Sequence, residues 1–165
     1  MLHSPALRTL VACATVLSAL GACTTTPSTS PPRSTPPRSI PAQLAAFSTT
    51  LSGMSQVPPV PRSLTSATGR VDAVLDKNTR LLRWKLSFQG LTGEAVAGHF
   101  HGPAAIGLRA GVAVAFRGAL TSPMEGQITL NPAQAADLLA GNWYVDIHTL
   151  AFPAGEIRGQ MTLRE

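Results

Sequence analysis

The feature that most limits the fold is a strict alternation of apolar and polar side chains at residues 82–88, Leu-Arg-Trp-Lys-Leu-Ser-Phe. Successive side chains of a β-strand point to opposite faces, so the four apolar side chains would share one buried face. Similar stretches, separated by Gly, Pro and Asn, recur at residues 45–52, 68–75, 95–101, 112–118, 124–130, 143–149 and 155–163. This spacing is typical of an antiparallel β-sandwich, so the sequence predicts an all-β domain.

One short helix interrupts the strand pattern. Asn131 is a favoured N-cap residue, Pro132 suits the first helical position, and the alanine-rich residues 133–140 favour a helix. Gly141 stands where a helix often ends in a left-handed residue. We expect Leu138 and Leu139 of this helix to cover one end of the sandwich.

The start of the chain predicts export and lipid attachment. Residues 10–20 are apolar but too short to span a bilayer, which is typical of a signal peptide. They end in Leu-Gly-Ala-Cys at 20–23, which resembles the lipobox of bacterial lipoproteins, where the cysteine is acylated and the peptide is cut just before it. We expect residues 1–22 to be removed and Cys23 to carry palmitate and a membrane anchor, on the outer membrane or cell surface. An ordinary secretory signal with an incidental cysteine is the alternative.

The rest of the chain divides into a tether and one domain. Residues 23–42 are almost entirely Thr, Ser, Pro and Arg, a composition that predicts a disordered tether, and residues 43–165 suffice for one core. Because Cys13 would leave with the signal peptide, no thiol stays free for a disulfide, a nucleophile or a cysteine zinc site. Excluding the arginines before residue 43 leaves ten basic against eight acidic residues and no basic run, so nucleic acid is not an expected partner.

Three histidines form the candidate metal site. His99 and His101 are two residues apart and would share one face of a strand, and His148 can supply a third imidazole. Neutral imidazoles suit copper and zinc, so the sequence predicts a copper or zinc site. Two alternatives stay open: a structural hydrogen-bond network, and direct contact of these histidines with another ligand.

Three charged residues are candidates for supporting roles around those histidines. In residues 143–149, Asp146 and His148 alternate with apolar residues, so both would leave the core face. Glu156 and Arg158 would share a face of the next strand, and a hairpin would bring them close to Asp146. Asp146 would then orient a metal-bound imidazole or pair with Arg158, and Glu156 and Arg158 are better explained as an ion pair or loop anchor than as catalytic groups.

The ordered set of motifs resembles the CHRD (chordin-type) domain. The residues that carry the resemblance are Trp-Lys-Leu at 84–86, His-Phe-His-Gly-Pro-Ala at 99–104, Leu-Leu-Ala-Gly at 138–141, Trp-Tyr-Val-Asp-Ile-His-Thr at 143–149 and Pro-Ala-Gly-Glu-Ile-Arg-Gly-Gln at 153–160. The resemblance spans residues 45–163 and implies an immunoglobulin-like β-sandwich. Asp146 departs from the asparagine usual in the family and adds a carboxylate that could serve as a ligand.

Two classes of function follow. The first is a membrane-tethered, extracytoplasmic CHRD domain that binds copper or zinc; the second is an adhesion or interaction module for protein or polysaccharide, with structural histidines. An enzyme is less favoured, because no Gly-x-Ser-x-Gly motif occurs and no thiol remains. The His-x-His pair is similar to that of copper–zinc superoxide dismutases, but their bridging histidine has no counterpart here, so dismutase chemistry is the weaker enzymatic alternative.

Overall fold

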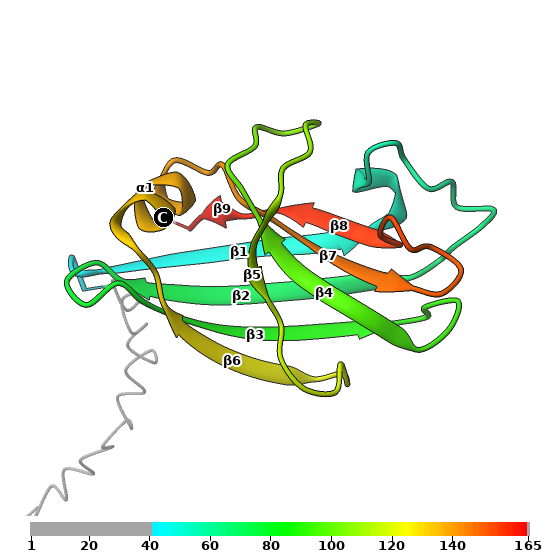
Figure 1. The fold of residues 1–165 in the computed structure, drawn as a ribbon, viewed down its shortest axis with the longest axis horizontal. Helices are drawn as coiled ribbons and strands as arrows, with labels where there is room; N and C mark the ends of the chain where they lie inside the picture. Colours follow the sequence, from blue (N-terminus) through cyan, green and yellow to red (C-terminus); the bar gives the residue numbers. More distant parts are fainter. Residues whose placement is uncertain (1–40, 165) are drawn as a thin grey trace, which may run out of the picture. The chain divides into compact units, whose positions relative to one another are not determined.

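The computed structural model describes residues 41–164, so Cys23 and the expected signal peptide lie outside the described residues. This part of the chain holds nine β-strands, one α-helix and one short 3-10 helix (Figure 1). The strands are β1 (Leu44–Ser52), β2 (Thr68–Asp76), β3 (Leu81–Gln89), β4 (Ala95–His101), β5 (Val112–Ala115), β6 (Met124–Thr129), β7 (Tyr144–Thr149), β8 (Ile157–Gln160) and β9 (Thr162–Leu163). The helices are η1 (Gly53–Ser55) and α1 (Pro132–Leu139). Among residues 41–164, no helix has the length and hydropathy needed to cross a membrane.

All the strands belong to one antiparallel sheet. Its order is β5-β4-β7-β8-β1-β2-β3-β6, with β9 beside β1, and it curls so that β4 lies across the core from β3 (Figure 1). The rings of Trp84 on β3 and Phe100 on β4 meet edge to face, 5.4 Å between centroids. The all-β prediction with one short helix is confirmed. An immunoglobulin-like sandwich is not confirmed, because pairing of Ser52 with Arg158 continues the ladder from β1 to β8 instead of separating two sheets.

The core follows the alternation expected from the sequence. On β3, Leu82, Trp84 and Leu86 are buried and the charged residues between them are exposed. On β7, Trp143 before the strand and Val145 and Ile147 within it have no exposed surface. The largest fully buried side chains are Trp143, Phe47, Phe100, Leu51, Leu75, Leu82, Leu86, Leu130, Leu138, Ile147, Ile157 and Met161.

Helix α1 begins and ends as predicted. The Asn131 Oδ1 accepts from the Gln134 N–H at 2.9 Å, and the Gln134 Oε1 accepts from the Asn131 N–H at 3.0 Å, which forms a capping box. Gly141 follows with φ +75°, the left-handed conformation that glycine adopts without strain. Leu138 is fully buried, but the prediction for Leu139 is wrong, because that side chain points outward and is 38% exposed.

Two predicted strands are shorter than expected. The strand predicted at 155–163 is broken at Met161, whose N–H donates to the Trp143 carbonyl at 2.8 Å while its side chain enters the core. This break lets β8 pair with β7 and β9 pair with β1. The strand predicted at 112–118 ends at Ala115, before Gly118 turns the chain with φ +85°.

Candidate metal centre

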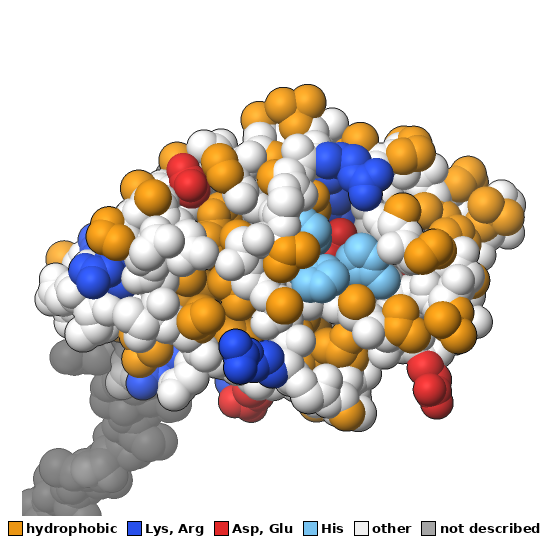
Figure 2. Space-filling model, viewed as in Figure 1, with side chains coloured by type: hydrophobic (Ala, Val, Ile, Leu, Met, Phe, Trp, Pro, Cys, Tyr) orange, Lys and Arg blue, Asp and Glu red, His pale blue; other side chains and the backbone are white. Residues whose placement is uncertain are grey.

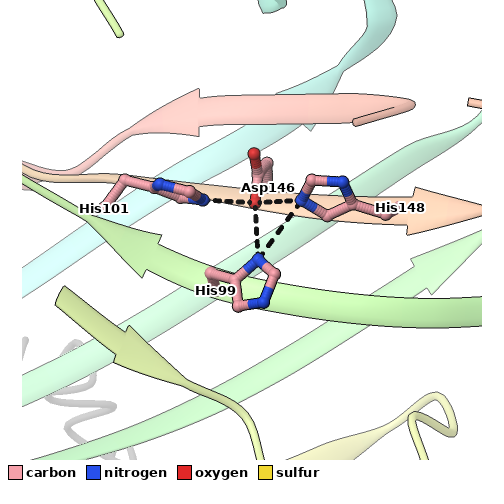
Figure 3. Close-up of side chains that lie close together, drawn as sticks. All are labelled: His99, His101, Asp146 and His148. Atoms are coloured by element: carbon pink, nitrogen blue, oxygen red, sulfur yellow. Dashed lines mark hydrogen bonds and ion pairs between the residues drawn. The ribbon is translucent and has the colours of Figure 1, made fainter. Parts of the chain in front are cut away.

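Three histidines and one aspartate converge on the outer face of the sheet, and we call them the His–Asp cluster: His99, His101, Asp146 and His148 (Figure 3). In the β4–β7 ladder, His99 pairs with Asp146, and His148 lies two pairs further along, opposite Ala97. Alternation places all four side chains on one face, while Phe100, Val145 and Ile147 fill the core on the other. The strand register therefore builds the site on the surface of a rigid sheet.

The candidate ligand atoms are close together. The Asp146 Oδ1 lies 3.0 Å from the His101 Nε2 and 2.9 Å from the His148 Nε2. The His99 Nδ1 lies 3.3 Å from the His148 Nε2 and 3.7 Å from the same carboxylate oxygen. All four ligand atoms fall within 4.8 Å of one another. The geometry brings together every histidine predicted for the site, together with Asp146, whose carboxylate the sequence already offered as a possible ligand.

Hydrogen bonds to loop carbonyls fix the tautomers of two histidines. The His101 Nδ1 lies 3.0 Å from the Ala110 carbonyl oxygen, and the His148 Nδ1 lies 3.0 Å from that of Pro153. A carbonyl oxygen only accepts, so each Nδ1 carries the hydrogen and donates it. In the neutral imidazoles both Nε2 atoms then present lone pairs to the Asp146 carboxylate. Such an arrangement needs a cation at its centre, either protons on the imidazoles or a metal ion.

The pKa shifts of Asp146 and His148 also favour positive charge next to the carboxylate. Burial alone would raise the pKa of Asp146, but hydrogen bonds with His101 and His148 outweigh it and lower that pKa to about 2. The hydrogen bond to Asp146 raises the pKa of His148, although burial opposes the rise. Burial lowers the pKa of His99, in spite of the opposing charge of Asp146. The carboxylate thus stays ionised and draws positive charge to the Nε2 atoms.

The comparisons with known proteins concern the whole domain. A family model described as the CHRD domain matches residues 47–161, a range that contains the entire His–Asp cluster. The chain belongs to the CHRD-domain family. No curated protein and no solved structure gives a significant match to it. The family resemblance predicted from the sequence is confirmed for the CHRD domain itself.

A stack of side chains supports His101 in this CHRD domain. The Tyr144 ring lies parallel to the imidazole with 4.7 Å between centroids, and its hydroxyl lies 3.2 Å from both the N and the O of Ala110. The Arg158 guanidinium lies 3.5 Å from the centre of the Tyr144 ring. The stack and the loop of residues 102–111 hold His101 in one orientation, as outer groups do for metal ligands. Alternation along residues 143–149 puts Tyr144 on the same face as Asp146 and His148, but no pattern in the sequence gives it a role.

Glu156 lies apart from the cluster. Its carboxylate accepts hydrogen bonds from Thr65 Oγ1 at 2.6 Å, from the N–H and Oγ1 of Thr92 at 3.0 and 2.8 Å, and from Thr149 Oγ1 at 2.7 Å. Burial would raise the pKa of Glu156, but these bonds lower it. It forms no ion pair with Arg158, so of the two predicted supporting roles the structure gives it that of a loop anchor.

One neighbour of the cluster carried no signal in the sequence. The Gln56 Nε2 is buried and has no hydrogen-bond partner among the described residues. A Cβ added at Gly155, which has φ +109°, would overlap the Gln56 amide and lie 3.4 Å from the Asp146 Oδ2. The Gln56 amide and the Asp146 Oδ2 therefore both lie close to Gly155. Only the folded path of the loop after η1 brings Gln56 there.

Proposed function

We propose that this CHRD domain binds one zinc or copper ion through His99, His101, His148 and Asp146. The single observation that carries the proposal is the meeting of two Nε2 lone pairs on one carboxylate oxygen, because neutral imidazoles in these tautomers would repel it. A divalent cation among the four side chains would remove this repulsion and form four metal–ligand bonds, one to each of them. Three imidazoles and one carboxylate form a ligand set that both zinc and copper accept.

The size of the cluster suits a four-coordinate ion. Ligands at about 2.0–2.1 Å from a tetrahedral zinc lie about 3.3–3.4 Å from one another. Four of the ligand-atom pairs here are 2.9, 3.0, 3.3 and 3.7 Å apart, and the others lie within 4.8 Å. Small outward shifts of the rings from Asp146 Oδ1 would open the cluster around the ion. During these shifts, the hydrogen bonds to the carbonyls of Ala110 and Pro153 would keep the Nε2 atoms of His101 and His148 pointing toward the ion.

Metal titration of the purified protein tests the proposal. Chelator-treated protein receives zinc or copper(II) in a calorimeter, with metal content checked by elemental analysis. We expect one ion per chain. His101→Ala and Asp146→Asn remove direct ligands, so each should lose at least the affinity, about 10–100-fold, that is lost when a group that only orients a ligand is removed. Asp137→Asn on helix α1 is the matched control and should bind as the wild type does. Absence of uptake by a folded wild-type protein would reject the proposal and favour the alternative, binding of protein or polysaccharide through structural histidines.

We also propose that the domain works at a membrane surface outside the cytoplasm. The apolar stretch at 10–20 and the Leu-Gly-Ala-Cys sequence at 20–23 support this, since together they form a lipoprotein export pattern. Two or more acyl chains would give stable attachment. Labelling of cells with radioactive palmitate should mark the wild type and leave Cys23→Ser unlabelled, and equal labelling of both would reject lipidation at this residue.

A further inference from the structure

Arg158 is a buried cation with few partners. Its side chain is 3% exposed, and among the described residues its one hydrogen bond runs from Nη2 to the Leu108 carbonyl at 2.6 Å. It forms no ion pair in residues 41–164, although a guanidinium offers five N–H donors. No nitrogen of Arg158 is both unpartnered and sealed from solvent, so the unused donors lie at an opening of the surface. A buried charge of this kind is stabilised by an anion.

This guanidinium lies next to the His–Asp cluster. Arg158 on β8 is directly opposite Asp146 on β7, and its guanidinium covers the ring of Tyr144, which stacks on His101. Burial lowers the pKa of Arg158, and the charge of Arg109 adds to that effect while Asp146 opposes it. Basic side chains border the histidines and the carboxylate on the same face of the molecule (Figure 2).

Arg109 supplies a second, exposed cation. The residues on either side of Arg109 both accept hydrogen bonds near the cluster. The Leu108 carbonyl accepts from Arg158, and the Ala110 carbonyl accepts from His101. The charge of Arg109 also opposes the rise in the pKa of His148. Arg109 itself makes no hydrogen bond or ion pair through its side chain within residues 41–164. No hydrogen bond or ion pair within residues 41–164 would therefore compete with a ligand for its guanidinium.

The charges around the cluster do not balance. Asp146 is the one carboxylate that acts on Arg158, against two guanidinium groups, and a divalent ion would add two further positive charges. The candidate ligands all rise from one face of two neighbouring strands, and histidine side chains are visible at the surface there (Figure 2), so an ion in the cluster would be reachable from solvent. Guanidinium groups bind the paired oxygens of carboxylates and phosphates, and a zinc or copper ion held by the four protein ligands could take an oxygen as a fifth ligand.

We propose that the metal centre and Arg158, aided by Arg109, form one site for a small oxyanion of the carboxylate or phosphate type. One oxygen would bind the metal ion and another would accept from the guanidinium. This inference rests on the proposed metal binding. It assigns to Arg158 a direct contact with a ligand, beyond its packing against Tyr144.

Anion titration of the purified full-length protein tests the site. Inorganic phosphate and, separately, acetate are titrated by calorimetry into zinc-loaded and metal-free protein at fixed ionic strength. We expect binding to the zinc-loaded wild type, and affinity about tenfold weaker without zinc or in Arg158→Gln. Arg109→Gln, an exposed change, should weaken anion binding several-fold in the zinc-loaded protein. Arg83→Gln, an exposed arginine on β3, is the matched control and should behave as the wild type.

Each outcome decides the inference. Zinc binding with no uptake of either anion, or with equal anion affinity in Arg109→Gln and the wild type, overturns the oxyanion site and leaves the metal site standing. Failure of zinc to bind overturns both proposals, and the zinc titration made beforehand identifies that case. If Arg158→Gln does not fold, Arg109→Gln still decides.

Discussion

Replacing Asp146 with asparagine should separate the proposed metal-binding role of the His–Asp cluster from its structural role. The amide Nδ2 of an asparagine, placed where the Asp146 Oδ1 now lies, has two hydrogens, one for the Nε2 of His101 and one for that of His148. The variant would satisfy both neutral imidazoles without any cation. We therefore expect Asp146→Asn to lose metal affinity and yet to fold well without metal at alkaline pH.

The size of the effect follows from the pKa of Asp146. A fall from 3.8 to about 2 corresponds to about 2 kcal/mol of interaction with protonated partners. Because this pKa is depressed, its contribution is present above about pH 4 and is lost as pH falls toward 2. The pKa of His148 is raised, so its contribution is complete below about pH 6.5 and is lost as pH rises through the higher folded value. The lowered pKa of His99 has the opposite effect on stability, because it reduces the unfolding free energy as the pH falls, but this effect develops only below about pH 6.5.

Urea unfolding in the presence of chelator measures this directly. On acidification from pH 5 to pH 2 the metal-free wild type should lose about 2 kcal/mol of unfolding free energy as Asp146 is protonated. Between pH 6 and pH 9 it should lose stability again as His148 deprotonates, and Asp146→Asn should change far less in both ranges. Asp137→Asn, the control, should follow the wild type, and zinc should restore the wild type at pH 9. The reasoning is refuted if the metal-free wild type is equally stable at pH 6 and pH 9, or if Asp146→Asn shows the same loss.

Three further changes test other parts of the structure. Glu156→Gln sets an amide NH₂ against hydroxyl donors and should lower the unfolding free energy by about 1–3 kcal/mol with metal affinity unchanged; weaker metal binding without lost stability would contradict its role as a loop anchor. Tyr144→Phe keeps the ring on His101 but removes the contacts to Ala110, so zinc competition should show a few-fold loss of affinity, and a loss as large as that of His101→Ala would contradict this account. Gly126→Ala would push a methyl group into the Trp84 ring, so thermal unfolding should show a loss of about 1–3 kcal/mol, and an unchanged midpoint would show that the ring can move.

The sequence predicted the strands with clear alternation and could not predict how they meet. The pattern at 82–88 identifies β3 and its buried face, and the His-x-His pair identifies a shared face on β4. Alternation likewise put Asp146 and His148 on one side of β7. The convergence on a single carboxylate oxygen depends on the register of β4 against β7, which pairs His99 with Asp146, and local periodicity contains no information on register.

The residues whose positions the local sequence pattern did not predict share a physical cause. Glu156 precedes β8 in a turn, so the alternation of the strand did not apply to it, and three threonines from separate segments determined where its carboxylate lies. Gln56 reaches the cluster through a loop, where no period operates. The break at Met161 arises because a buried side chain and a bond to Trp143 outweigh continued pairing. In each case contacts between residues far apart in the sequence, rather than the local alternation of apolar and polar residues, determine the structure.

The position of the His–Asp cluster explains how an all-β surface can hold a precise set of ligands. The sheet fixes the backbones of His99, Asp146 and His148, because the residues next to them on β4 and β7 bury their side chains in the core on the other face of the sheet. The rings still need orientation, and loops provide it: the Ala110 carbonyl holds His101 and the Pro153 carbonyl holds His148. A bound ion would tie both loops to the sheet through the same two imidazoles. Metal occupancy and the order of these loops are therefore linked thermodynamically, and the loop that carries Arg109 would be ordered by the same event that creates a charge for an anion to neutralise.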